Sequence, residues 1–93
     1  MSETGRITVE KPTPEKLKKL GVKSWPIWEK EASTFDWHYD SSETCFLLAG
    51  RARVTPSGGA PVEFGAGDLV QFPAGMDCVW EVLQPVRKHY RFG

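Results

Sequence analysis

The stretch Gly67-Asp-Leu-Val-Gln-Phe-Pro-Ala-Gly75 decides the fold. A four-residue run rich in apolar residues lies between two sets of glycine and proline turn signals, which is the pattern of a short strand between tight turns. The same pattern fills the chain after Gly21. Strand-like runs lie at residues 25–28, 34–37, 44–48, 52–55, 62–64, 69–72, 79–83 and 86–92, and turn signals at residues 40–42, Gly50, 56–59, 65–68 and 73–75. This regular spacing predicts a single all-β domain over residues 1–93, built as a sandwich or barrel.

The segment before Gly21 has a different character. Residues 7–10 are β-branched and predict a short edge strand. Thr13 can cap a helix, Pro14 suits the first helical position, and Gly21 suits a left-handed stop. We therefore expect one short helix here. Its lysines are interleaved with glutamates and are interpreted as a solvated face.

Charge and hydropathy limit the classes of partner. The 93 residues carry 12 Lys plus Arg and 12 Asp plus Glu, so the formal net charge is zero. A nucleic-acid partner would favour a surplus of basic residues, and no such partner is expected. No apolar run approaches the roughly 20 residues needed to cross a bilayer, and residues 1–4 do not begin a signal peptide, so a cytoplasmic protein without membrane contact is expected.

A first motif supports a more specific fold. Asp36-x-His38 is followed by Glu43 and then by Gly50. This order resembles the first motif of the cupin family, in which His-x-His precedes a Glu three or four residues on and a Gly seven residues later. The resemblance places Asp36 at the position of the first histidine.

A second motif lies in the stretch quoted above. Gly67, Pro73 and Gly75 resemble the second cupin motif. Cys78 occupies the position of its histidine, and Val82 that of its asparagine. Together the two motifs resemble a cupin jelly-roll β-barrel with one short N-terminal helix.

The closer resemblance is to small single-domain cupins related to ureidoglycine aminohydrolase. It is carried by residues 21–28, Trp37, residues 43–50, 67–75 and 78–80, and residues 86–90. It implies a homodimer and a site inside the barrel. The enzyme of that family is manganese-dependent and has an acidic residue at the first ligand position, with which Asp36 is compatible.

Four residues form the candidate metal set: Asp36, His38, Glu43 and Cys78. Asp36 and His38 share one strand face because side chains alternate, and the cupin arrangement implies that all four converge inside the barrel. Mixed nitrogen and oxygen ligands suit Mn, Fe, Ni or Zn, while a thiolate favours the softer metals. A metal-free pocket is the alternative. His38 would then be a polar residue near the barrel mouth, Glu43 an acceptor for an internal Lys or Arg, and Cys78 a small buried hydrophobe.

Lys88 is a second candidate for chemistry. Residues 86–92 alternate so that Lys88, Tyr90 and Phe92 share one face, and the preference of Phe92 for burial points all three inward. A buried lysine needs a carboxylate partner, and Glu43 is the candidate. Glu43 and Lys88 are the candidate catalytic residues.

The same alternation predicts that Trp37 points to the face opposite Asp36 and His38. Trp80 shares a face with Cys78 and is predicted, with Tyr90, to contact a ligand. Trp25 and Trp28 are predicted to cover the barrel end or a dimer surface. Cys45 is predicted to be core, and a Cys45–Cys78 disulfide is the alternative if both face inward.

Three functions remain open from the sequence. The first is a metal-dependent enzyme acting on a small polar amide or ureido compound. The second is a metal-free domain that binds a small molecule. The third is a homodimeric interaction module with outward aromatic residues at its interface.

Overall fold

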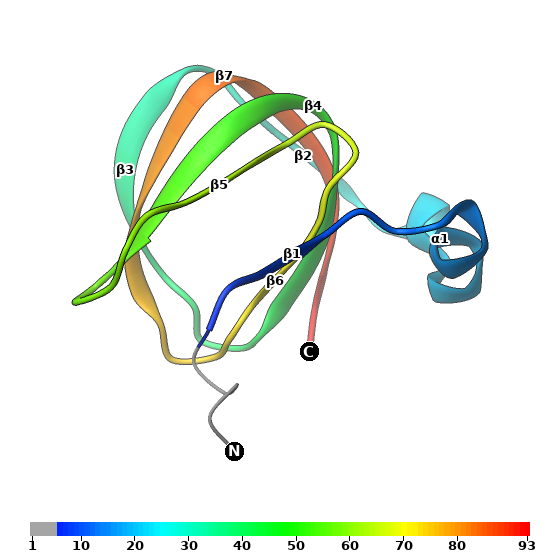
Figure 1. Cartoon of the computed structure of the whole chain (residues 1–93), viewed down its shortest axis with the longest axis horizontal. Helices are drawn as coiled ribbons and strands as arrows, with labels where there is room; N and C mark the ends of the chain where they lie inside the picture. The colour runs from blue at the N-terminus through cyan, green and yellow to red at the C-terminus, as the bar shows by residue number, and fades with distance from the viewer. Residues whose placement is uncertain (1–5) are drawn as a thin grey trace.

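A computed structural model describes residues 6–93 of the chain. The expectation that residues 1–4 do not begin a signal peptide therefore lies outside the described residues. Figure 1 shows the strands curled around a common interior, with one helix to the side. In chain order the elements are β1 (Thr8–Glu10), α1 (Pro14–Leu20), the 3-10 turn η1 (Val22–Ser24), β2 (Ile27–Lys30), β3 (Ser33–His38), β4 (Glu43–Pro56), β5 (Val62–Gly65), β6 (Leu69–Phe72) and β7 (Asp77–Phe92).

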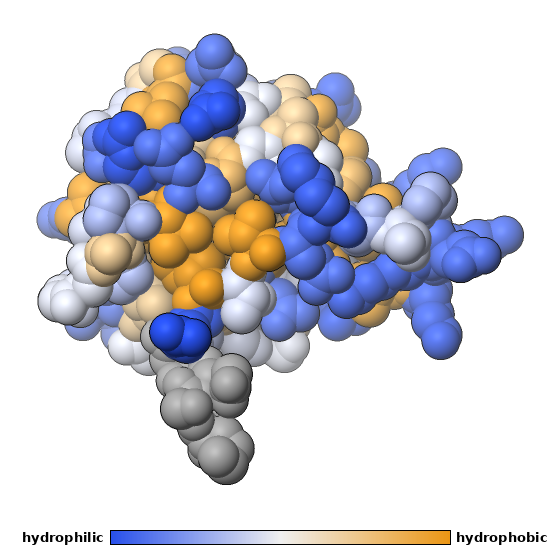
Figure 2. Space-filling model, in the orientation of Figure 1, coloured by the Kyte–Doolittle hydropathy of each residue, from blue (hydrophilic) through white to orange (hydrophobic). Residues whose placement is uncertain are grey.

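The prediction of one short α-helix is confirmed, with its capping residues. The Thr13 hydroxyl accepts a hydrogen bond from the Lys16 backbone N–H at 3.1 Å, and Gly21 ends α1 in the left-handed conformation at φ 72°. No residue of α1 is buried, and Figure 2 shows a strongly hydrophilic surface over it. Neither helix in residues 6–93 is long and apolar enough to cross a membrane.

The two long strands β4 and β7 organise the sheet. They pair antiparallel with each other from Glu43↔Phe92 to Pro56↔Cys78. At one end of this pair β3 joins β7 and β5 joins β4; at the other end β2 joins β7, β6 joins β4, and β1 joins β6. The all-β prediction is confirmed. The strands curl around a common interior (Figure 1), and the hydrogen-bonded sheet that they form is not closed.

The predicted strand break at Gly50 is wrong. β4 runs through this position, and the pairing with β7 shifts register between Leu47 and Ala52. Such bulges bend a strand without ending it, so one long strand can serve both ends of the sheet. Gly50 has φ 92°, and a Cβ built there would lie 2.1 Å from the Pro85 carbonyl oxygen.

Gly50→Ala is therefore expected to be strongly destabilising. The positive φ alone costs a non-glycine residue on the order of 1–3 kcal/mol, and the clash with the β7 backbone adds to it. Gly58→Ala is the matched control, because Gly58 has φ 75° and open space around its Cβ position. Urea unfolding should show a larger loss for Gly50→Ala; equal losses would mean that close packing against β7 contributes nothing.

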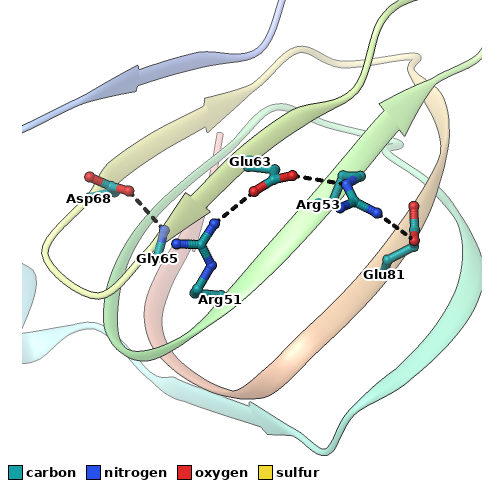
Figure 3. A network of polar contacts seen from close by, with 6 residues as sticks. All are labelled: Arg51, Arg53, Glu63, Gly65, Asp68 and Glu81. Atoms are coloured by element: carbon teal, nitrogen blue, oxygen red, sulfur yellow. Dashed lines mark hydrogen bonds and ion pairs between the residues drawn. The ribbon is translucent and has the colours of Figure 1, made fainter.

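The outer face of β4, β5 and β7 carries a ladder of charges. Glu63 accepts hydrogen bonds from Arg51 at 2.7 Å and from Arg53 at 3.0 Å, and Arg53 also donates to Glu81 at 3.1 Å (Figure 3). Because these side chains are solvated, the ion pairs add little to the free energy of unfolding. The charges mark this face as the solvent side and assign the alternate residues to the interior.

Candidate functional site

Strand β3 decides which side chains face the interior. Its pairing with β7 sets Phe35 opposite Trp80 and Trp37 opposite Cys78. Trp80 and Cys78 are buried, so Phe35 and Trp37 share the inner side with them. Asp36 lies on the opposite side and is exposed.

The predicted convergence of the metal set is wrong for Asp36 and His38. His38 is exposed, with its Nδ1 2.7 Å from an Asp77 carboxylate oxygen and its Nε2 3.4 Å from Asp40. Glu43, in contrast, is buried with only 4% of its surface exposed. The strand alternation that puts Asp36 and His38 on one face puts that face toward solvent.

A shift of one residue explains the error. The first cupin motif allows three or four residues between His-x-His and the glutamate, and Glu43 fits both choices. Read with three intervening residues, the motif places Trp37 and Tyr39 at the histidine positions. Tyr39 is 1% exposed and Trp37 lines the internal cavity, so the inward pair is aromatic and offers no imidazole.

Cys78 is buried, as the sequence indicated, but it is engaged elsewhere. Its Sγ lies 3.7 Å from the Trp37 carbonyl oxygen, to which the thiol donates. Burial, and then the charge of Asp77, raise the pKa of the Cys78 thiol to about 11. Cys45 is fully buried, and burial raises its pKa to about 12. Both cysteines are free, so the alternative of a disulfide is wrong.

A cavity of about 220 Å³ lies on the inner side of the curled sheet. This is below the roughly 300–1,000 Å³ of sites for drug-sized ligands, so it suits a smaller molecule. Two of its walls were named from the sequence as ligand contacts, Trp80 and Tyr90. The complete lining is Trp28, Phe35, Trp37, Tyr39, Glu43, Trp80, Lys88, Tyr90 and Phe92.

The predicted pair of Glu43 and Lys88 is confirmed. The Lys88 ammonium donates to a Glu43 carboxylate oxygen at 2.9 Å, and each side chain is only 5% exposed. The two residues come from the central strands: Glu43 begins β4, and Lys88 lies on the paired half of β7 opposite Leu47. Alternation along both strands turns the two side chains to the same inner side.

Aromatic rings surround the Lys88 ammonium. Its Nζ lies 4.7 Å from the ring centroid of Trp80, 4.9 Å from that of Trp28 and 5.9 Å from that of Phe72. These distances are within the range of cation–π attraction, which strengthens when water is excluded. The expectation that Trp28 covers the barrel end or a dimer surface is corrected: β2 pairs Trp28 with Lys88 itself.

Tyr39 contributes a hydroxyl group to the same cavity lining. Its Oη accepts a hydrogen bond from the Trp80 indole N–H at 3.0 Å. Burial, and then the negative charge of Glu43, raise the pKa of Tyr39 far above its ordinary value. The phenol therefore remains neutral across the physiological range.

Sequence reasoning missed four cavity residues: Trp28, Phe35, Trp37 and Tyr39. A signal for three of them was present. Phe35-x-Trp37-x-Tyr39 is an unbroken alternation of aromatic residues, and three aromatics on one face argue for the buried side. Asp36 and His38, as the intervening polar residues, then fall on the solvent side.

The interior donors do not fit a divalent cation. They comprise one carboxylate already bonded to an ammonium and the two thiols of Cys45 and Cys78, whose raised pKa values keep them protonated, whereas metal ligands must be deprotonated. Among residues 6–93, no group of three or more His, Cys, Asp or Glu side chains is placed to hold a metal ion.

Comparison with known proteins places the chain in a family. The family model of the EutQ-like cupin domain matches residues 17–90. A DUF861 family protein from Thermotoga maritima is 56% identical, with a TM-score of 0.93 over 95% of this chain and 100% of that one.

More distant structures share the fold. The Clostridium difficile EutQ protein is 24% identical, with a TM-score of 0.65 over 71% of this chain and 52% of its own. A putative ethanolamine utilization protein Q from Salmonella typhimurium is 19% identical, with a TM-score of 0.66 over 92% of this chain and 68% of its own. No curated protein matches the sequence.

Proposed function

Because the chain belongs to the EutQ-like cupin family, we propose that its interior cavity binds a small, neutral, polar molecule anchored by Glu43 and Lys88. The observation that carries the proposal is the ion pair in the cavity wall, 2.9 Å long and 5% exposed on each side. Two charges removed from water are costly even when paired. An apolar pair would pack there at lower cost, so a ligand-binding role accounts for polar groups at this position.

The chemistry of the walls narrows the ligand class. The pair is neutral as a whole, so a net charge on the ligand would go uncompensated in the low-dielectric interior. An ammonium has three donors and a carboxylate several acceptor sites, and the pair uses one of each on itself. An amide or ureido group presents an acceptor to Lys88 and a donor to Glu43. The aromatic walls favour a flat molecule.

Catalysis is the second part of the proposal. The resemblance to ureidoglycine aminohydrolase suggests an amide or ureido substrate, on which Glu43 would accept and Lys88 donate protons. No step is assigned to manganese or another divalent metal, because the interior donors do not fit one.

Ligand binding can be followed by tryptophan fluorescence. Trp28, Trp37 and Trp80 line the cavity, so propionamide or N-methylurea at millimolar concentration should change the emission in a saturable manner. Binding should also raise the midpoint of thermal unfolding by mass action. If neither probe produces a saturable change, the cavity does not bind this class.

A double variant supplies the matched control. Glu43→Leu with Lys88→Met removes both charges and keeps apolar volume, so the protein should fold but lose the fluorescence response. Glu29→Leu with Arg87→Met removes an exposed ion pair of β2 and β7, with 67% and 55% of the side chains exposed. This second variant should bind as the natural sequence does.

A further inference from the structure

Lys88 differs from every other lysine of the chain. It is 4% exposed, whereas the remaining six are on the surface: Lys11, Lys16, Lys18, Lys19, Lys23 and Lys30. Its ammonium lines a cavity and touches a carboxylate at 2.9 Å. Removal from water favours the neutral amine of a lysine, which is the form that attacks carbonyl compounds, and a carboxylate at hydrogen-bond distance can accept the proton that the ammonium has to lose.

We propose that Lys88 condenses with a small neutral aldehyde to form a protonated imine, with Glu43 transferring the protons. This inference rests on the proposed function of the same cavity and names the reactive class of its ligand. The aldehyde oxygen accepts a hydrogen bond as an amide oxygen would, and its alkyl or aryl part contacts the aromatic walls.

The protons balance within the pair. The Lys88 ammonium gives one proton to the Glu43 carboxylate, and the free amine attacks the carbonyl carbon. The new C–N bond forms as the π electrons move to oxygen, which takes the proton of Glu43 while nitrogen returns one to it. Glu43 then protonates the hydroxyl, water leaves, and the nitrogen lone pair completes the C=N bond. The carboxylate is restored, and the positive charge ends on the imine.

The aromatic rings around the Lys88 ammonium stabilise both the starting ammonium and the protonated imine that the reaction forms. Trp28 and Trp80 lie 4.9 and 4.7 Å from Nζ, so their faces stabilise a cation there before and after condensation. The same rings limit the water that would hydrolyse the imine. The neutral amine that forms in between is accompanied by a neutral carboxylic acid, and no isolated charge has to be buried at that point.

Reductive trapping tests the inference. The protein is incubated with propanal and sodium cyanoborohydride, which converts an imine to a stable propyl amine, and peptide mass spectrometry reports the site. We expect Lys88 to be propylated at least about tenfold faster than Lys23, and propionamide to protect Lys88 alone. Glu43→Asp draws the carboxylate back by one methylene and should slow Lys88 labelling at least about tenfold, because positioned proton transfer contributes roughly 10²–10⁴ to a rate.

The outcomes separate the two proposals. If Lys88 is labelled no faster than Lys23 while propionamide still gives a saturable fluorescence change, the imine is overturned and the binding cavity stands. If neither labelling nor fluorescence responds, both are overturned. Should Glu43→Asp prove unfolded by circular dichroism, protection of Lys88 by propionamide in the natural sequence decides the question alone.

Discussion

Lys88→Met is expected to lower the free energy of unfolding by about 3–5 kcal/mol, the range found when one partner of a buried ion pair is removed. The variant leaves the Glu43 carboxylate buried with no cation beside it. The hydrogen bond at 2.9 Å and the cation–π contacts of the ammonium disappear together. Urea unfolding, followed by circular dichroism, gives the loss directly.

Removing both charges should restore most of that stability. Glu43→Leu with Lys88→Met has no stranded charge, and replacement of a buried pair by apolar residues is often neutral or stabilising. Arg87→Met is the control, because it removes one partner of an exposed ion pair. It should lower the free energy of unfolding by no more than about 1 kcal/mol, since Glu29 remains solvated. A double variant as unstable as Lys88→Met would show that the loss reflects packing around Lys88, with no contribution from a stranded carboxylate.

Trp80→Ala is expected to cost about 3–5 kcal/mol, as truncation of a buried aromatic residue generally does. Trp80 is 2% exposed and meets four other rings, at centroid distances of 5.5 to 6.1 Å: Trp28, Phe35, Phe64 and Phe72. Its loss also leaves the Tyr39 hydroxyl without its indole donor. The measurement is again the midpoint and slope of urea unfolding.

Trp37→Ala is the comparison for this variant. Trp37 lines the same cavity but is 46% exposed, so its truncation creates little enclosed void and should cost clearly less. Both variants should change ligand-induced fluorescence, because both remove a cavity wall. Equal losses of stability would mean that the interior is held by the sheet alone and not by packing around Trp80.

The sequence predicted well what depends on local alternation. The inward direction of Lys88 and its pairing with Glu43 followed from alternation along residues 86–92, and the structure confirms both. The premise that Phe92 is buried is wrong, because Phe92 lines the cavity but is 52% exposed. The prediction that α1 ends at Gly21 also rested on a local signal, because glycine readily adopts the left-handed conformation. Each of these rests on a period of two or on a capping position, which the chain displays without knowledge of its partners.

The misplaced residues depend on contacts that no local pattern displays. Gly50 looks like a turn residue, but it lies in a bulged part of β4 where the backbone passes close to Pro85 across the sheet. Asp36 and His38 were oriented by a motif whose spacing admits two registers. A register shift of one residue moves every side chain of a strand to its other face, so this single ambiguity displaced two of the four candidate ligands.

The pairing of β4 with β7 has a consequence for how the chain reaches this state. The partners along these strands are Pro56 with Cys78 at one end and Glu43 with Phe92 at the other, so every rung closes a long loop. Loop-closure entropy is lost before these contacts stabilise the chain, and topologies dominated by such contacts fold slowly. The Pro56–Cys78 end closes the shortest loop, with the segment of β5 and β6 inside it. We therefore expect pairing to spread from that end, to bring Glu43 and Lys88 together late, and to complete the cavity only as folding finishes.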